Sequence, residues 1–432
     1  MNDEKQGKNE VKIKLTTAII LIIVLLLVII GIALIMISKN GQNIFQYNTA
    51  TGNLSTDQVL VSDFSIKFLK MENDNQNIIY SPLSIKYALK MLNEGANGNT
   101  KTQIENVIGK LNLPKYDNIN NVLSLANGVY IRDTYAKYVK VDYRKLLTEK
   151  YNAEINYDSF SNADNINNWI ENKTLGIIKN MVSDGMVQNE NTEMLLINAL
   201  AINMDWEDSF DVSITSGKEF NLEDGSKMTA TMMNKETKSD SVAYYKDNDI
   251  TALTMDLQKY DDIQLEFIAI MPQDNLSDYI ETVTIDDINN IINKSISASK
   301  TKYGVDILIP RFSFDYDLKL KDDLIGFGIT DAFRDDLADF SNMSNREGLY
   351  VGDALHKANI DFTEKGITAS AATVIGMMDK AMIANPTKPE EIKIDKPFMY
   401  LIRDKEAEEI WFVGTVYEPN SWEEDKADYK YR

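Results

Sequence analysis

The chain of 432 residues contains no cysteine and only one histidine, His356. The absence of cysteine excludes disulfides, cysteine-ligated zinc and a cysteine nucleophile. A single histidine cannot form a histidine-ligated metal cluster. A serine hydrolase would have to use His356 as its base, although the chain has no Gly-x-Ser-x-Gly turn. We therefore expect a protein that is not an enzyme and that carries neither a metal ion nor another cofactor.

Basic residues are also in the minority, with 45 Lys and Arg against 66 Asp and Glu and a formal net charge of −21 at pH 7. Nucleic-acid backbones are held mainly by Lys and Arg, so this balance argues against a nucleic-acid partner. A large net charge favours a soluble, monomeric state. The content of 44% hydrophobic and 26% charged residues is otherwise that of a globular protein, and we expect a monomer.

Charged side chains are missing altogether from Ala18 to Ile37. About 20 apolar residues span the hydrocarbon core of a bilayer, whereas a cleaved signal peptide needs a shorter apolar region and a small-residue cleavage site. We therefore predict a transmembrane helix over residues 15–37. Lys5, Lys8, Lys12 and Lys14 precede it, and the positive-inside rule places residues 1–14 in the cytoplasm. The prediction is a single-pass protein of the cell membrane whose remaining chain is extracellular.

Polar and turn-forming residues predict a stalk over residues 38–57, a single folded domain over 58–420 and a charged, solvated tail over 421–432. Helical spacing of apolar residues predicts helices over Val59–Met71 and Ser84–Leu92, and a third helix that Asp164 and Asn165 cap and that continues through Ile177. Met194–Ile202 is nearly all apolar, as in a strand buried on both faces. Further strands are predicted at Leu265–Met271 and in a hairpin of Phe398–Arg403 and Ile410–Tyr417, which gives an α+β fold.

The segment from Glu364 to Pro397 is unusually long for a connection, and long connections of this kind are functional or disordered. Its first part contains no proline, which would forbid a place in the centre of a sheet. Residues at every second position form a mostly apolar face: Ile367, Ala369, Ala371, Thr373, Ile375 and Met377. The pattern is typical of a strand that has no partner yet, with Gly366 as a flexible pivot. Composition alone also allows a flexible Ala/Ser-rich linker.

Several motifs, in their order along the chain, resemble those of the serpins, a family of serine protease inhibitors. They are Tyr80–Ile85, Asn167–Glu171 with Thr174 and Gly176–Ile178, Asn198–Leu200 with Trp206, Ala338–Ser341, Leu355–Ala358, Glu364–Gly366 with the Ala/Ser-rich run after it, Lys396–Phe398 and Phe412–Gly414. The match covers roughly residues 58–420. The chain is identified as a member of bacterial type with an N-terminal membrane anchor. The resemblance implies a fold of three β-sheets, about nine helices and an exposed reactive-centre loop.

The resemblance also implies a mechanism of suicide inhibition. A serine protease cleaves the loop and forms an acyl-enzyme, and the loop over residues 364–380 then inserts as a central β-strand and traps the protease. The hinge of this loop comprises Glu364, Lys365, Gly366, Ile367, Thr368, Ala369, Ser370, Ala371, Ala372 and Thr373. Counting family positions from Glu364 places the reactive bond between Lys380 and Ala381. A basic residue there implies a trypsin-like protease, with a subtilisin-like one as the other candidate; Met378, Met382 and Lys388 are alternative cleavage positions.

Two further groups follow from the same resemblance. The breach, where the loop enters the sheet, comprises Arg311, Trp206 and Glu364, with Glu364 expected to pair with Arg311. The shutter, a polar cluster beneath the central strands, comprises Ser81, Ser84, Asn198 and His356. One departure is Ile367, because the family usually has Thr or Ser at this first inserting position. A bulky residue there slows insertion, which leaves a non-inhibitory surface binding or scaffold protein as the alternative function.

Overall fold

The computed structural model describes residues 56–110, 113–368 and 388–430. The predicted membrane segment 15–37, nearly all of the stalk, the hinge residues Ala369–Thr373 and the reactive bond Lys380–Ala381 lie outside these ranges. Among the helices that are described, none combines the length and the apolar character needed to cross a bilayer.

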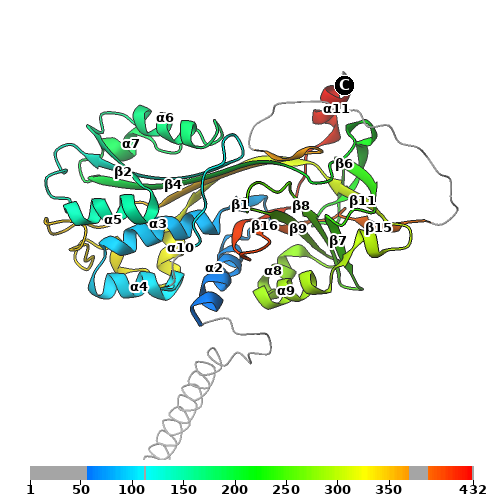
Figure 1. The fold of residues 1–432 in the computed structure, drawn as a ribbon, viewed down its shortest axis with the longest axis horizontal. Helices are drawn as coiled ribbons and strands as arrows, with labels where there is room; N and C mark the ends of the chain where they lie inside the picture. Colours follow the sequence, from blue (N-terminus) through cyan, green and yellow to red (C-terminus); the bar gives the residue numbers. More distant parts are fainter. Residues whose placement is uncertain (1–55, 111–112, 369–387, 431–432) are drawn as a thin grey trace, which may run out of the picture. The chain divides into compact units, whose positions relative to one another are not determined.

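Three β-sheets and ten α-helices make up the part of the chain that the structure describes, which confirms the predicted α+β architecture (Figure 1). The helices are α2 (Thr56–Glu72), α3 (Pro82–Gly95), α4 (Gly98–Ile108), α5 (Val141–Tyr151), α6 (Asp164–Lys173), α7 (Asp184–Gln188), α8 (Leu276–Thr282), α9 (Ile285–Lys294), α10 (Leu320–Gly326) and α11 (Trp422–Lys430).

Sheet A has six strands in the order β12-β13-β14-β4-β2-β3. Their bounds are β12 (Phe312–Lys319), β13 (Leu355–Phe362), β14 (Gly366–Thr368), β4 (Met194–Asp205), β2 (Leu123–Arg132) and β3 (Glu154–Asp158). Sheet B has seven strands, in the order β1 (Ile78–Tyr80), β17 (Ile410–Val416), β16 (Phe398–Asp404), β9 (Leu265–Pro272), β8 (Ile250–Asp256), β7 (Val242–Lys246) and β10 (Ile296–Ser297). Sheet C has four: β15 (Glu390–Lys393), β11 (Val305–Pro310), β6 (Lys227–Thr237) and β5 (Ser216–Asn221).

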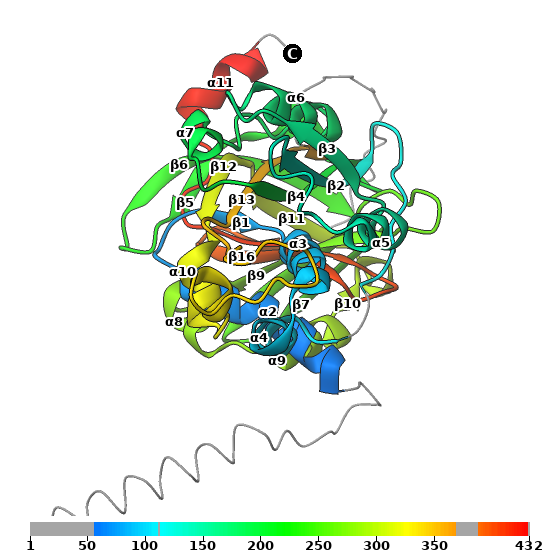
Figure 2. The same cartoon turned by 90° about the vertical axis from the view of Figure 1, so that its left-hand side faces the viewer.

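The helix predicted to run from Asp164 through Ile177 is shorter than its apolar pattern indicates. The helix α6 ends at Lys173, and Ala163, not Asp164, occupies its N-cap position. The hydroxyl of Thr174 donates to the carbonyl of Ile170 at 2.8 Å and accepts from the N–H of Ile178 at 3.0 Å. Because this side chain takes over backbone bonds at the helix end, Ile177 lies beyond the helix. The helix α6 itself covers sheet A near β2 and β3 (Figure 2).

The strand β4 was predicted to be buried on both faces, and its middle, residues 197–202, is buried. Its first three residues are only half-buried, because a groove runs beside that end of the strand. At the other end, sheets A and B pack through aromatic rings. Phe362 stacks on Phe312 with centroids 4.6 Å apart and meets Phe267 of sheet B at 4.6 Å. This cluster fixes the floor beneath the point where β13 turns into β14.

The C-terminal segment, predicted to be a solvated tail, forms the helix α11 instead. It packs on β5 and β6, with the ring of Trp422 so close to Gly217 that a Cβ there would lie 2.4 Å from the ring. Asn420 anchors the start of this segment. Its backbone N–H donates to Arg311 O at 3.1 Å, and its side-chain oxygen accepts from Ser313 N–H at 2.9 Å. The charged side chains of Glu423, Glu424 and Lys426 are exposed, whereas Trp422 packs on sheet C and the preceding Asn420 bonds to Ser313 of sheet A.

We predict that Trp422→Ala lowers the free energy of unfolding by about 1–2 kcal/mol, because a half-buried ring gives about half of what a fully buried large apolar side chain contributes. The measurement is urea unfolding of the variant beside Lys426→Ala, which alters the exposed pair Lys426–Glu423 on the same helix and should change stability by less than about 0.5 kcal/mol. Equal effects of the two substitutions would show that α11 does not depend on Trp422.

Candidate functional site

The hinge begins inside sheet A, not outside it. After β13 the chain turns at Thr363–Lys365, and β14 pairs antiparallel with both β13 and β4. Ile367 lies opposite Phe362 on one side and Met204 on the other. Only 2% of Ile367 is exposed, so its side chain already belongs to the core. The expectation that the whole segment after Gly366 starts in solvent is therefore wrong for its first residues.

Trp206 holds the turn between β13 and β14. Its indole N–H donates to the carbonyl of Thr363 at 2.8 Å, and its backbone N–H donates to the carbonyl of Lys365 at 2.8 Å. The backbone N–H of Phe210 donates to the carbonyl between them, that of Glu364, at 2.9 Å. Three consecutive carbonyls of the turn are thus bonded to the segment after β4. The ring of Trp206 is buried against Phe362 and Phe267.

Gly366 has a different role from the predicted pivot. A Cβ at this position would lie 2.1 Å from the carbonyl oxygen of Met204, a distance that no side chain tolerates. The residue is therefore required because β14 approaches β4 closely at its first residue. Beside it, the ammonium of Lys365 lies 3.4 Å from the carboxylate of Asp205.

Glu364 is buried at the breach, where its carboxylate accepts a hydrogen bond from the hydroxyl of Thr215 at 2.8 Å. Sequence reasoning missed Thr215. Burial raises the pKa of the nearby Asp361, Arg311 opposes the rise, and negative charge on Asp425 and Glu364 adds to it. The specific pairing of Glu364 with Arg311 stays a prediction.

The structure brings the four predicted shutter residues together and adds a fifth. The N–H of Ser81 donates to His356 Nε2 at 3.0 Å, and Ser81 Oγ, at the N-cap of α3, accepts from the N–H of Ser84. The hydroxyl of Ser84 donates to Asn198 Oδ1. The amide of Asn198 donates to Asn127 Oδ1 at 2.7 Å. Asn127 was not predicted to belong to the shutter. Its position as a polar residue in the largely apolar strand β2 could have indicated it.

Burial lowers the pKa of His356 to about 4. Because Nε2 accepts a hydrogen bond from a backbone N–H, the neutral ring carries its proton on Nδ1. A second proton would have to be placed on Nε2, facing a donor. The imidazole is thus a neutral structural acceptor, and its surroundings do not suit a catalytic base.

Two apolar depressions continue between β4 and β13 where β14 stops. The upper crevice, of only about 10 Å³, lies between Leu200–Ile202 on one side and Asn359 and Ile360 on the other, with Ile177 and Ile178 also lining it. The lower groove, of about 230 Å³, has one wall formed by residues 189–197 and a second formed by residues 349–355. Helices α3 and α10 contribute its floor. The open space between these two strands therefore lies mainly at the end of the sheet away from β14.

Acid is predicted to destabilise the fold through His356. Its pKa falls from about 6.5 in the unfolded chain to about 4 in the folded one, so the unfolded chain binds the extra proton between these values. The free energy of unfolding should therefore drop as pH falls from 7 to 5, by about 2 kcal/mol more in the natural chain than in His356→Gln. Denaturant unfolding of both at the two pH values measures this difference, in which contributions of unchanged carboxyl groups cancel. A histidine NMR signal that titrates near pH 6.5 would contradict it.

Comparison with known proteins agrees with this geometry. The family model described as "Serpin (serine protease inhibitor)" matches residues 60–419. An uncharacterized serpin-like protein of Methanosarcina mazei is 30% identical over 87% of this chain and 93% of its own length. Among solved structures, native tengpin, a thermophilic serpin, superposes with a TM-score of 0.70 at 26% identity, covering 87% of this chain and 98% of that one. Thyroxine-binding globulin complexed with thyroxine gives 0.69 at 25% identity, with coverage of 84% and 99%. The chain belongs to the serpin family of serine protease inhibitors.

Proposed function

We propose that the protein is a single-use trap for a serine protease, in which the cleaved reactive-centre loop completes sheet A. One observation carries the proposal: β14 is bonded on both sides, and a small crevice beside it and a larger groove at the other end lie between the same two neighbouring strands. Ile367 already fills the first inward position, which removes the objection that a bulky residue there slows the start of insertion. What remains to be inserted begins with small side chains, at Ala369 and Ser370.

The register of β14 predicts where each further residue will lie. Ile367 is level with Phe362 and Met204, so Ala371, four residues on, comes level with Ala358 and Leu200. Both of these neighbours are buried, which restricts position 371 to a small side chain. Thr373 comes level with His356 and Asn198, so its hydroxyl is placed at the shutter. The shutter thus offers hydrogen-bond partners to Thr373, and the other polar residue on this face, Asp379, comes at the end of the inserted stretch.

The same register supports Lys380 as the residue before the reactive bond. Thirteen residues after Ile367, it comes level with Leu349 and Asn191, at the end of the lower groove. Cleavage at Met378 would leave the end of the groove unfilled, and cleavage after Lys388 would leave eight residues beyond it. Met382 fits nearly as well as Lys380. A basic residue at the reactive bond suits a trypsin-like target, whose pocket carries a carboxylate.

Insertion supplies the energy for trapping. The twelve residues from Ala369 to Lys380 that remain to be inserted span roughly 40 Å at about 3.3 Å per residue, which would move an attached protease along most of the sheet. A dozen new ladder hydrogen bonds at about 0.5–1.5 kcal/mol net give on the order of 10 kcal/mol. That energy is comparable to the stability of a typical domain, so it suffices to distort the active site of the protease.

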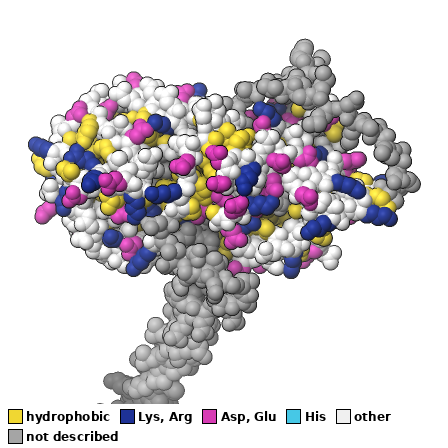
Figure 3. Space-filling view, viewed as in Figure 1, with side chains coloured by type: hydrophobic (Ala, Val, Ile, Leu, Met, Phe, Trp, Pro, Cys, Tyr) yellow, Lys and Arg dark blue, Asp and Glu magenta, His cyan; other side chains and the backbone are white. Residues whose placement is uncertain are grey.

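We place this inhibitor at the cell surface, with residues 15–37 as its anchor and residues 38–57 as a stalk. The uncharged run and the lysines before it support this location. On the face of the domain shown in Figure 3, carboxylates are interspersed with Lys and Arg side chains. This distribution agrees with the net charge of −21 and with a protein, not a nucleic acid, as the partner.

The second candidate function is a surface binding or scaffold protein of the same fold without inhibition. The similarity to thyroxine-binding globulin, solved with thyroxine, favours it, because that protein shows the fold holding a small ligand. The two functions differ in one property. A trap must gain stability when its loop is cut, whereas a binding protein has no need of that gain.

Mixing the full-length chain with trypsin tests the trap. We expect a covalent complex that survives denaturing electrophoresis, joined through the protease serine, and a released peptide that begins at Ala381 in mass spectrometry. The matched variant Lys380→Gln should lose the complex with trypsin. Cleavage elsewhere in the loop without a complex, and without a rise in melting temperature, would favour the binding protein.

Ala371→Arg should convert the inhibitor into a substrate. The inserted guanidinium would be buried beside Ala358 and Leu200 without a partner, which halts insertion and gives the protease time to complete hydrolysis. Ala371→Ser keeps the side chain small and should retain the complex. The ratio of complex to cleaved inhibitor measures both variants, and an unchanged ratio in Ala371→Arg would contradict strand insertion.

A further inference from the structure

One peptide group beside the breach is hydrogen-bonded on both of its sides. Its N–H, that of Phe210, donates to the carbonyl of Glu364 at 2.9 Å. Its carbonyl, that of Ser209, accepts from the ammonium of Lys235 at 2.9 Å. Lys235 lies on β6 of sheet C, whereas Glu364 lies in the turn that leads into β14 of sheet A. A continuous chain of hydrogen bonds therefore runs from a lysine of one sheet to the start of the hinge in another.

The ammonium of Lys235 is itself fixed in position. Besides the carbonyl of Ser209, it contacts Asp208 Oδ1 at 2.5 Å and lies over the ring of Phe210, 5.6 Å from the centroid. The other carboxylate oxygen of Asp208 accepts from the hydroxyl of Thr237 at 2.6 Å. Only 8% of Lys235 is exposed, and burial lowers its pKa, while the carboxylate of Asp208 opposes this fall. One buried side chain thus contacts three consecutive residues, 208–210.

The segment that Lys235 contacts has no regular structure that would orient its peptide groups. Strand β4 ends at Asp205, and the next element is a short 3-10 helix at Val212–Ile214, so residues 207–211 belong to neither. Side-chain contacts must therefore set the orientation of the Ser209–Phe210 peptide group. A hydrogen bond from an ammonium is stronger than one between neutral groups, and one bond in a chain polarises the next. Lys235 thus favours the orientation in which the N–H points at Glu364.

We propose that Lys235 is a positioning residue for the hinge, which orients the Ser209–Phe210 peptide group and so keeps the start of the reactive-centre loop bonded in sheet A. The consequence for trapping rests on the proposed function. A hinge that stays in the sheet lets insertion continue from a formed strand, whereas a hinge that detaches must first pair again. Loss of the ammonium should therefore slow insertion and shift the outcome from trapping towards simple cleavage.

Amide hydrogen exchange in the intact full-length chain tests the positioning directly. Lys235→Met keeps the apolar stem and removes the ammonium. We expect the amides of residues 364–368 to exchange about three- to tenfold faster in this variant, while those of the core strand β9 keep the natural rate. A general loss of stability would accelerate both. Lys235→Arg should keep the hinge slow, and so should the matched control Lys227→Met, on the same strand, where the lysine pairs with Glu219 at 2.6 Å.

A second variant separates the peptide group from the ion pair. Asp208→Asn removes the carboxylate but leaves the ammonium bonded to Ser209, so the hinge should exchange within about twofold of the natural rate. Natural exchange at residues 364–368 in Lys235→Met would overturn the inference, as would an equal acceleration in Asp208→Asn. If Lys235→Met does not fold, Lys235→Gln, which is shorter and uncharged, takes its place in the same comparison.

Reaction with trypsin tests the consequence for trapping. We expect the ratio of covalent complex to cleaved inhibitor to fall about threefold in Lys235→Met and to stay near the natural value in Lys235→Arg and Lys227→Met. If the natural chain forms no complex, the proposed function fails, while the exchange of the hinge still decides whether Lys235 positions it. An unchanged ratio in Lys235→Met, beside faster exchange at the hinge, would overturn the link between this lysine and trapping.

Discussion

The pairing of a three-residue strand with two neighbours at once is the interaction on which the rest of this structure depends. The strand β14 holds β13 and β4 apart at one end of sheet A and bonds to both. Beyond Thr368 the two neighbours border a crevice and a groove instead of a strand. The sheet is therefore complete at the breach and incomplete below it. Backbone groups along an unfilled gap are the strongest available template for another strand.

The hydrogen bonds made by Trp206 and Phe210 explain why the turn before β14 stays in place. Three carbonyls of the turn accept hydrogen bonds from the segment after β4. Beneath them, the ring of Trp206 packs closely against the ring of Phe362. Close packing makes such a site switch between discrete states instead of deforming gradually. The shutter, at the middle of the sheet, can rearrange more easily than the closely packed turn, because a polar cluster can exchange one hydrogen-bond partner for another. The neutral imidazole of His356 suits this exchange, since burial excludes its charged form.

The sequence predicted the elements with strong periodicity and the residues that carry family motifs. The strands β9, β16 and β17 and the helices α2 and α3 lie where their patterns placed them. It did not predict β14 as a formed strand, because three residues carry too little pattern to distinguish a paired strand from an exposed one. Thr215 and Asn127 were missed because their partners are far away in the chain, at Glu364 and Asn198. The tail became α11 because Trp422 finds a place on Gly217, a contact that composition does not encode.

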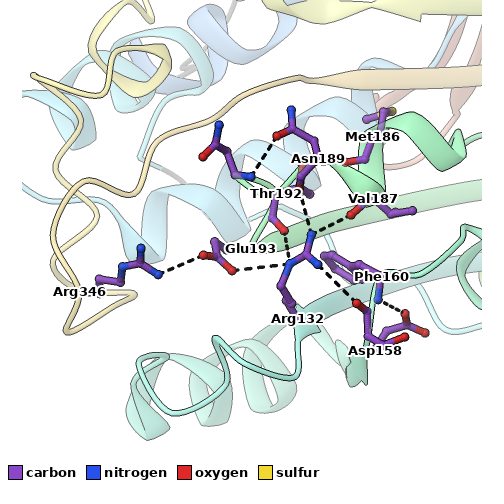
Figure 4. A network of polar contacts seen from close by, with 11 residues as sticks. Arg132, Asp158, Phe160, Met186, Val187, Asn189, Thr192, Glu193 and Arg346 are labelled. Atoms are coloured by element: carbon purple, nitrogen blue, oxygen red, sulfur yellow. Dashed lines mark hydrogen bonds and ion pairs between the residues drawn. The ribbon is translucent and has the colours of Figure 1, made fainter.

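The two ends of sheet A contribute differently to the same movement. At the hinge, the first step is already made, so in the proposed trap a cut loop would continue a strand whose start is already bonded on both sides. At the far end, Arg132 and Glu193 fix the segment before β4 (Figure 4), and Arg346 belongs to the same side of the sheet, because residues 343–345 are bonded to 138–140 after β2. These contacts fix one border of the groove and do not bridge it. The control that the described residues provide therefore lies at the hinge, where the register of the added strand is set, and the new ladder would supply on the order of 10 kcal/mol once the strand extends from there.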